Sequence, residues 1–177
     1  SDKIVTLGPV VRSRITTLGR FGIYVTSIIS PLLPVAEQAK LLREMQPSVL
    51  WIYPTALRAL LRHLGTLSSI ITPRMVVTSA EPLDEVLRQE LLSDRPAELR
   101  NFYGSVEAGR IAFTCPAGEG LHINTDCSIL QFDEEEQAAG FGRPVIVTNL
   151  NSRVSPYIRY RLGDYCRLIE KRCSCGS

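Results

Sequence analysis

The sequence predicts an α/β fold: a mostly parallel sheet flanked by helices and followed by a smaller β-rich subdomain. Between residues 3 and 99, short runs of β-branched residues alternate with stretches of helical periodicity, which is typical of layered α/β domains. A proline stands at the start of each of the three helical stretches, where its missing N–H costs no hydrogen bond. After about residue 108 only short strand patterns remain, separated by turns that contain Gly and Asp.

The first two β–α units have the clearest periodicity. A strand is expected at 21–29 and a helix from Pro34, in which Leu41, Leu42 and Met45 recur one turn after Gln38. A second strand is expected at 49–53, and a helix from Pro54 ends at Gly65. The apolar stripe of this second helix comprises Leu57, Leu60, Leu61 and Leu64.

The third unit has a strand at 75–78 and a helix that we expect to begin at Pro82. Asp84 and Glu85 then lie in its first turn, where carboxylates favour the positive end of the helix dipole. The side chains expected to face inward are Leu83, Val86, Leu87 and Leu91. Such units favour a parallel sheet.

Further strands are expected at 121–124, 127–132, 144–148 and 164–169, and the acidic run at 133–136 is interpreted as a solvated hairpin tip. With 177 residues, the chain can form one domain with a small appended unit. We place the boundary between residues 112 and 113.

Composition argues against several classes of protein. The chain is 45% hydrophobic and 21% charged, with a net charge of +2 and no run of Lys or Arg, so we expect no nucleic-acid partner. Its apolar stretches, near 21–33 and 49–54, are too short and too interrupted to span a membrane. The five cysteines show no spacing typical of secreted proteins, which favours a reducing cytoplasm.

Three segments follow expected strands: 78–82, 101–107 and 159–164. Ligands of open α/β sheets bind beyond the carboxyl ends of the strands, so these segments are site candidates. Tyr103 could stack on a base, Glu107 suits a hard cation, and Asp164 suits sugar hydroxyls. Each also has a structural interpretation: a half-buried aromatic, a first-turn carboxylate and a turn residue.

The order of these motifs resembles the adenylate-forming superfamily, and within it the phenylacetate-CoA ligase group. The resemblance covers nearly the whole chain, including 47–64. Its most specific parts are Ala-Glu-Pro at 80–82, Tyr-Gly-Ser-x-Glu at 103–107, Gly-Leu-His at 120–122, Arg-Tyr-Arg-x-Gly-Asp at 159–164 and Cys-x-Cys-Gly at 173–176.

The resemblance implies a role for each matching residue in a nucleotide site. Ala80, Glu81 and Pro82 would line the adenine pocket, and Asn101 and Tyr103 would bind and stack on the base. Phe102 and Gly104 would shape the backbone beside them.

The phosphates and the ribose would be held by two carboxylates. Glu107, the implied catalytic residue, would hold Mg²⁺ against the phosphates of ATP, and Asp164 would accept hydrogen bonds from the ribose. Where the family usually has Thr or Ser before this Glu, the chain has Val106, so a phosphate contact is lost unless Ser105 replaces it.

The implied reaction is attack of a carboxylate on the α-phosphate of ATP, followed by thioester formation with CoA; an aryl or aryl-acetic acid is the expected substrate. The family's Ser/Thr/Gly-rich phosphate loop and its lysine-bearing mobile domain are absent from the sequence, which predicts an internal fragment that is inactive alone. Two alternatives stay open: a non-CoA acyl acceptor, and a zinc-stabilised nucleotide-binding module without catalysis. A homodimer is the assembly to test.

Four residues could form a structural zinc site: Cys115, His122, Cys173 and Cys175. Three thiolates and one imidazole suit tetrahedral Zn²⁺, and no position would be left open for catalysis. The alternative is four unconnected residues in a reduced protein. Cys127 and Cys166 are expected in the core and His63 on a helix surface, without a catalytic role.

Overall fold

The structure is a computed structural model that describes residues 2–8, 24–94, 98–115, 117, 120–133, 140, 142–152 and 154–176. Residues 21–23 of the first predicted strand and 134–136 of the acidic run lie outside these ranges. The folded chain divides into two compact units, Ser1–Asn101 and Phe102–Ser177, called here the N-terminal and C-terminal units. The domain boundary that we predicted between residues 112 and 113 stays a prediction.

Four parallel strands form the sheet of the N-terminal unit, in the order β2 (Tyr24–Ile29), β1 (Asp2–Leu7), β3 (Val49–Ile52) and β4 (Met75–Ser79). The strand order continues through β5 (Glu98–Ser105) to β6 (Gly109–Thr114) and β7 (Leu121–Ile123), which pair antiparallel. The α/β class with a mostly parallel sheet is thus confirmed.

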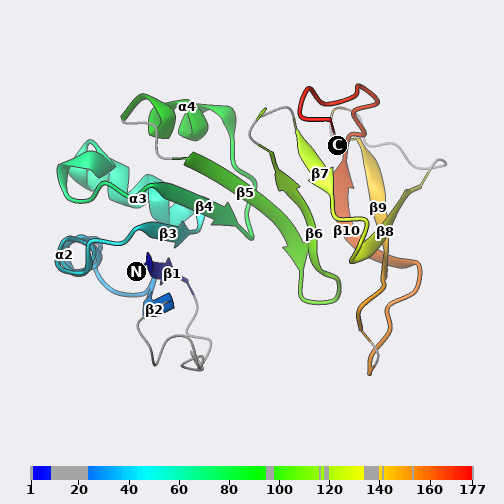
Figure 1. Ribbon diagram of the computed structural model, residues 1–177, viewed down its shortest axis with the longest axis horizontal. Helices are drawn as coiled ribbons and strands as arrows, with labels where there is room; N and C mark the ends of the chain where they lie inside the picture. Colours follow the sequence, from blue (N-terminus) through cyan, green and yellow to red (C-terminus); the bar gives the residue numbers. More distant parts are fainter. Residues whose placement is uncertain are drawn as a thin grey trace. The chain divides into compact units, whose positions relative to one another are not determined.

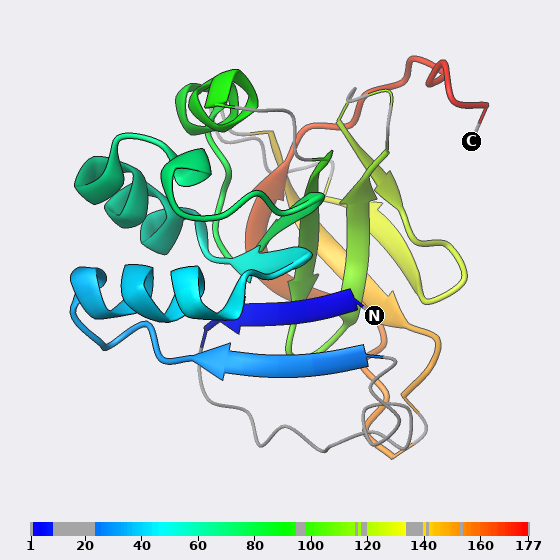
Figure 2. The same ribbon diagram turned by 60° about the vertical axis from the view of Figure 1, so that its left-hand side comes forward.

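The helices of the N-terminal unit are α2 (Val35–Met45), α3 (Pro54–Leu64), the short 3₁₀ turn η1 (Leu67–Ser69) and α4 (Glu85–Asp94). The predicted ends of α3 are confirmed, with Pro54 as its first residue and Gly65 as its C-cap. Figures 1 and 2 show α2, α3 and α4 along the same side of the strands. The described helices do not reach the length and apolarity that a membrane span requires.

Two expectations for α4 are wrong. The helix begins at Glu85 rather than at Pro82, because the Asp84 carboxylate accepts a hydrogen bond from the Leu87 N–H (2.9 Å) and caps the helix there. Val86 is 72% exposed, whereas Leu87 and Leu91 are buried. Leu87 and Leu91 lie four residues apart on one helix face, and Val86 is turned about 100° away from that face.

One apolar core joins the strands and helices of the N-terminal unit. Its members include Val5, Leu50, Leu57 and Leu87, from β1, β3, α3 and α4 respectively. All four side chains are at most 2% exposed. This core supports the carboxyl ends of β3 and β4. The predicted site segment 78–82 continues from the end of β4.

The C-terminal unit contains a second, antiparallel sheet in the order β10 (Tyr160–Cys166), β9 (Arg143–Asn149) and β8 (Ser128–Phe132). The predicted strand at 164–169 is displaced: β10 begins at Tyr160 and ends at Cys166, where its pairing with Arg143 of β9 ends. The ladder is irregular between Arg161 and Tyr165, where Gly163 has a φ of 87°. Because of this irregularity, a simple alternation pattern does not predict the bounds of the strand.

Candidate functional site

The loop after β4 has an unusual backbone. Ala80 has a φ of 69°, in the left-handed region that non-glycine residues rarely adopt. Its side chain and that of Pro82 are exposed. Such a conformation persists where the surrounding contacts fix it, and here the neighbouring Glu81 supplies those contacts.

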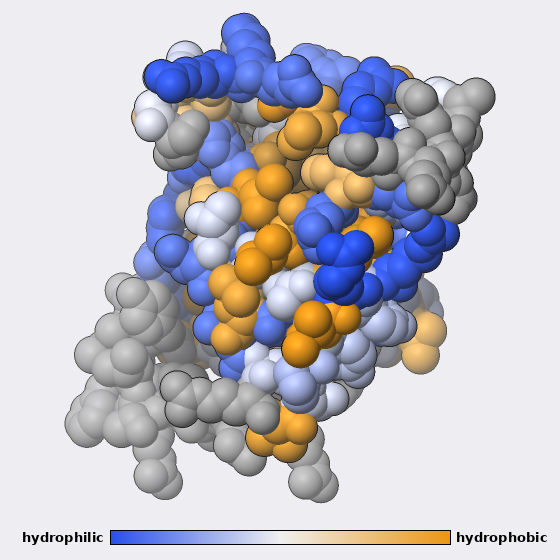
Figure 3. Space-filling model, turned by 90° about the vertical axis from the view of Figure 1, so that its right-hand side faces the viewer, coloured by the Kyte–Doolittle hydropathy of each residue, from blue (hydrophilic) through white to orange (hydrophobic). Residues whose placement is uncertain are grey.

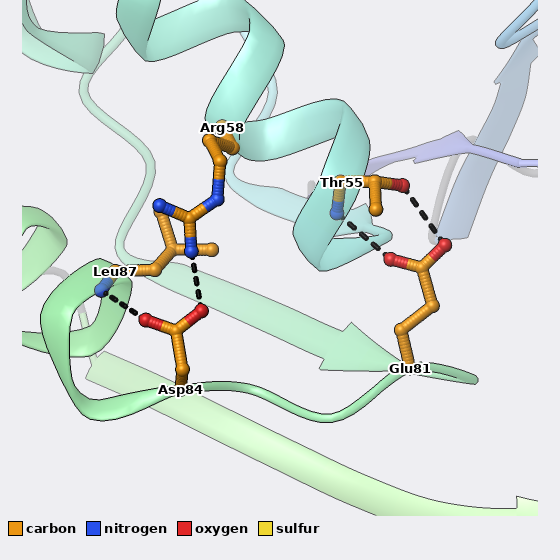
Figure 4. A network of polar contacts seen from close by, with 5 residues as sticks. All are labelled: Thr55, Arg58, Glu81, Asp84 and Leu87. Atoms are coloured by element: carbon orange, nitrogen blue, oxygen red, sulfur yellow. Dashed lines mark hydrogen bonds and ion pairs between the residues drawn. The ribbon is translucent and has the colours of Figure 1, made fainter.

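Glu81 caps helix α3 from outside that helix (Figure 4). One carboxylate oxygen accepts the Thr55 N–H at 2.8 Å and the other accepts the Thr55 hydroxyl at 2.8 Å. The N-cap residue of α3, Tyr53, makes no side-chain capping bond, and the first turn holds no acidic residue. Glu81 therefore satisfies a free N–H of α3 and places negative charge at its positive end.

Asp84 fixes the other end of the same loop. Its carboxylate accepts the Leu87 N–H and is paired with the guanidinium of Arg58 on α3 (Figure 4). The hydrogen bond from Leu87 and the pairing with Arg58 hold the Asp84 pKa below its ordinary value. The segment between Glu81 and Asp84 is thus held between the N-terminal ends of α3 and α4.

Asn101 lies in β5 and is the last residue of the N-terminal unit. Its Oδ1 accepts a hydrogen bond from the hydroxyl of Thr78 at 3.0 Å, and Thr78 on β4 is fully buried. The next residue of β4, Ser79, accepts a hydrogen bond from the Trp51 indole N–H of β3 at 2.6 Å. Polar contacts thus join the carboxyl end of β4, from which the segment 78–82 continues, to β3 and β5.

Tyr103 and Asp164 are joined in the C-terminal unit although they lie 61 residues apart. The Tyr103 hydroxyl donates a hydrogen bond to Asp164 Oδ2 at 2.7 Å. Burial of the Tyr103 ring, together with this bond to a carboxylate, raises the Tyr103 pKa above its ordinary value. Asp164 is exposed, and Oδ1 has no partner among the residues that the structure describes.

Phe102 and Gly104 flank Tyr103 on β5. The Phe102 ring lies near Phe113 (6.3 Å between centroids) and under the guanidinium of Arg110 (5.8 Å to the centroid). A Cβ at Gly104 would lie 2.3 Å from the carbonyl oxygen of Gly109. Only glycine therefore permits the close approach of β5 and β6 beside Tyr103.

Glu107 lies in the turn between β5 and β6. Its backbone carbonyl accepts a hydrogen bond from Asn149 Nδ2 of β9 (3.2 Å), and its carboxylate has no partner among the described residues. The Ser105 hydroxyl accepts the Ala108 N–H at 3.0 Å, which closes the turn. Val106 is fully exposed between them.

A pocket of about 510 Å³ lies within the C-terminal unit. Tyr103, Leu130 and Phe132 form part of its apolar wall, and Arg167 and Lys171 supply cationic side chains. Another wall includes Cys173, one of the four predicted metal ligands. The ligand atoms of Cys115, His122, Cys173 and Cys175 all lie within 4.8 Å of one another.

The structure therefore brings Tyr103 together with Asp164, and the four Cys and His residues with one another. Ala80, Glu81, Pro82 and Asn101 belong to the N-terminal unit, whereas the other predicted contacts belong to the C-terminal unit. Thr55 and Asn149 were missed by the sequence analysis. Thr55 lies in the first turn of a helix whose own N-cap residue makes no side-chain bond, and this position could have indicated a hydrogen-bond partner from elsewhere in the chain. No local pattern identifies Asn149.

The chain resembles known proteins both in sequence and in structure. The chain matches no protein-family model. It is 28% identical over 131 residues to protein CapK of Staphylococcus aureus, a match that covers 73% of this chain and 28% of CapK. The chain thus spans under a third of the length of this relative.

The solved structures that resemble this chain include acid–CoA ligases. A 2-hydroxyisobutyryl-CoA ligase in complex with 2-HIB-AMP and CoA superposes with a TM-score of 0.74 at 14% identity, over 99% of this chain and 42% of the ligase. A benzoate CoA ligase of Burkholderia xenovorans gives 0.60 at 16% identity, over 90% and 38%. VinN in complex with L-aspartate gives 0.57 at 21% identity, over 96% and 47%. The chain has the fold of part of these proteins.

Proposed function

We propose that this chain is the nucleotide-binding part of an AMP-forming acid–CoA ligase of the phenylacetate-CoA ligase group. The protein would join a carboxylic acid to the α-phosphate of ATP, releasing pyrophosphate, and then pass the acyl group to CoA with release of AMP. The observation that carries the proposal is the hydrogen bond between Tyr103 and Asp164. It joins two motifs that the sequence resemblance assigns to the base and to the ribose of one nucleotide.

The geometry of this pair suits a nucleoside. The Tyr103 hydroxyl fixes one oxygen of the Asp164 carboxylate, which leaves the other oxygen to accept hydrogen bonds from ribose hydroxyls. The Tyr103 hydroxyl is a neutral donor at physiological pH, and its raised pKa is in keeping with that role. The half-buried ring offers an aromatic surface for a base, and Gly104 permits the close approach of β6 beside it.

The loop at Ala80–Pro82 is the proposed adenine-pocket segment. Both carboxylate oxygens of Glu81 are occupied by Thr55, so Glu81 would contribute its backbone rather than its charge to the base. The left-handed Ala80 would direct the backbone polar groups of the loop. Thr55 is then a positioning residue for this segment.

Glu107 is the proposed ligand for Mg²⁺. A carboxylate oxygen is a hard donor of the type that Mg²⁺ prefers, and the Glu107 carboxylate has no partner among the described residues. The ion would neutralise negative charge on the phosphates of ATP. Asn149 holds the backbone of Glu107 in place through its carbonyl oxygen.

The substrates follow from the resemblance and from the similar structures. Complexes with an acyl-AMP and CoA are seen for the hydroxyisobutyryl-CoA ligase, and the benzoate CoA ligase is named for an aryl acid. We propose a small aryl or aryl-acetic acid and CoA as the substrates, in the cytoplasm. A carrier protein or an amine is the alternative acyl acceptor, and a homodimer the proposed assembly.

The test is calorimetric titration of the protein with AMP. Asp164→Asn keeps the bond from Tyr103 but removes the charge, and should weaken AMP binding about 10-fold or more, as expected for a hydrogen bond to a charged group. Tyr103→Phe should weaken it by roughly 5-fold. Asp126→Asn, an exposed carboxylate of the same unit, is the matched control and should leave binding unchanged. Equal affinities for Asp164→Asn and wild type would contradict the proposal.

A second candidate is a nucleotide-binding module without catalysis. Val106 favours it, because this fully exposed side chain has no hydroxyl at the position where the family usually has Thr or Ser. Acid-dependent exchange of pyrophosphate into ATP, measured on the full-length protein with a panel of carboxylic acids, separates the two. Exchange supports the ligase, and its absence with AMP binding retained supports the module.

A further inference from the structure

Three thiols and one imidazole meet at one point of the C-terminal unit. Cys115 follows β6, His122 lies in β7, and Cys173 and Cys175 lie beyond the end of β10. Cys115 Sγ is 3.4 Å from Cys173 Sγ, and Cys175 Sγ is 3.6 Å from His122 Nε2. All four ligand atoms lie within 4.8 Å of one another.

These separations suit a tetrahedral zinc ion. With Zn–S bonds of about 2.3 Å and a Zn–N bond of about 2.0 Å, ligand atoms at the corners of a tetrahedron lie roughly 3.5–3.8 Å apart. Both contacts lie at or near this range, and the cluster includes no carboxylate from the part of the chain that the structure describes. Soft thiolates select Zn²⁺ over Mg²⁺ or Ca²⁺.

The surroundings position the ligands. Cys115 is 8% exposed, so one ligand is fixed in the protein interior. The His122 ring packs against Phe113, its cross-strand partner on β6, at 6.2 Å between centroids. This contact orients the ring with Nε2 toward Cys175. One ligand thus lies in β7 and another directly after β6.

The other two ligands lie on a segment outside the helices and strands. Residues 167–172 and 174–176 are exposed and belong to no helix or strand. Ile169 approaches Gly120 so closely that a Cβ there would lie 2.7 Å from Ile169 Cδ1. Arg167, Lys171 and Cys173 of this segment line the 510 Å³ pocket. A bound ion would add to these contacts and fix the position of the segment.

We infer that Cys115, His122, Cys173 and Cys175 bind one structural Zn²⁺ ion that fastens segment 167–176 to the β6–β7 pair and thereby forms a wall of the pocket. All four positions of the tetrahedron are filled by protein, so the ion has no site for substrate. The inference is independent of nucleotide binding, because none of the four residues is a proposed nucleotide contact.

The first experiment measures metal in the protein purified under reducing conditions. Elemental analysis should find about one zinc per chain, and titration of the metal-free protein with Co²⁺ should give the intense absorption of tetrahedral cobalt thiolates. Cys175→Ser, an exposed position near the chain end, should reduce the zinc content at least 5-fold. Cys127→Ser and Cys166→Ser change half-buried cysteines outside the cluster and should retain the metal.

A second experiment measures what the metal holds. Chelation should lower the Tm of the protein by about 10 °C or more and increase hydrogen exchange in segment 167–176. Exchange in the helices of the N-terminal unit should not change. Less than a tenth of a zinc per chain, together with no cobalt thiolate absorption, would overturn the inference. A mass 2 Da below the reduced value, with a Cys115–Cys173 linkage found by peptide mapping, would also overturn it.

Discussion

The two units of this chain are stabilised in different ways. The N-terminal unit has a continuous apolar core, with contributions from four strands and three helices, whereas the central cluster of the C-terminal unit has Ala108, Ile111 and Val147 as its fully buried members. Most of the exposed large apolar side chains also belong to the C-terminal unit, among them Ile129, Ile158 and Leu168. Figure 3 shows apolar side chains gathered at the surface among hydrophilic ones.

The difference shows how a small unit compensates for limited burial. A unit of this size cannot remove much apolar surface from water, so a metal or another cross-link commonly supplies the missing stability. The Cys and His cluster lies in the unit with the smaller core. The N-terminal unit contains none of the five cysteines and relies on apolar packing instead.

The largest effect is expected from a cavity in the larger core. Leu57→Ala, at a fully buried position of α3, should lower the free energy of unfolding by about 3 kcal/mol. Urea unfolding followed by the fluorescence of Trp51, the single tryptophan, reports on this unit. The loss should be the same with and without a chelator, and Leu32→Ala, which is 92% exposed, should cost less than about 0.5 kcal/mol. A loss that depends on the chelator would contradict the claim that the N-terminal unit relies on apolar packing and not on the metal.

A smaller effect is expected from the cap that Glu81 provides. Glu81→Ala leaves the Thr55 N–H of α3 without its partner and should cost about 1 kcal/mol in the same assay. Glu44→Ala changes an exposed residue of α2 and serves as the control. Since Glu81 also fixes the Ala80 loop, this variant should in addition weaken AMP binding. Unchanged stability and unchanged AMP affinity together would show that the cap positions nothing.

The smallest effect is a pH dependence at Asp84. Its pKa is lowered in the folded state, so the ionised carboxylate adds stability above its ordinary pKa of about 4, and this stability is lost as the pH falls through the lower, folded-state value. The stability difference between wild type and Asp84→Asn should therefore shrink below about pH 4. Glu90→Gln, on the exposed side of α4, should show no such trend. A difference that grows on acidification would have the wrong sign.

The fold could be predicted well where an apolar stripe marks the buried face of a helix. The buried residues Leu57, Leu60 and Leu61 follow the predicted stripe, and the ends of α3 were predicted by Pro54 and Gly65. Prediction was wrong at α4, where Asp84 rather than Pro82 sets the first turn. It was also wrong at β10, where an irregular ladder breaks the alternation.

The sequence predicts the candidate site as a set of motifs but not as a geometry. Sequence by itself determined which residues could bind a base, a sugar or a metal, because residue type fixes donors, acceptors and charge. Only the tertiary structure decided that Tyr103 donates to Asp164 and that Glu81 caps α3 instead of presenting a free carboxylate. Such pairs join segments 26 to 61 residues apart, and their meeting depends on strand order and pairing, which no local periodicity encodes.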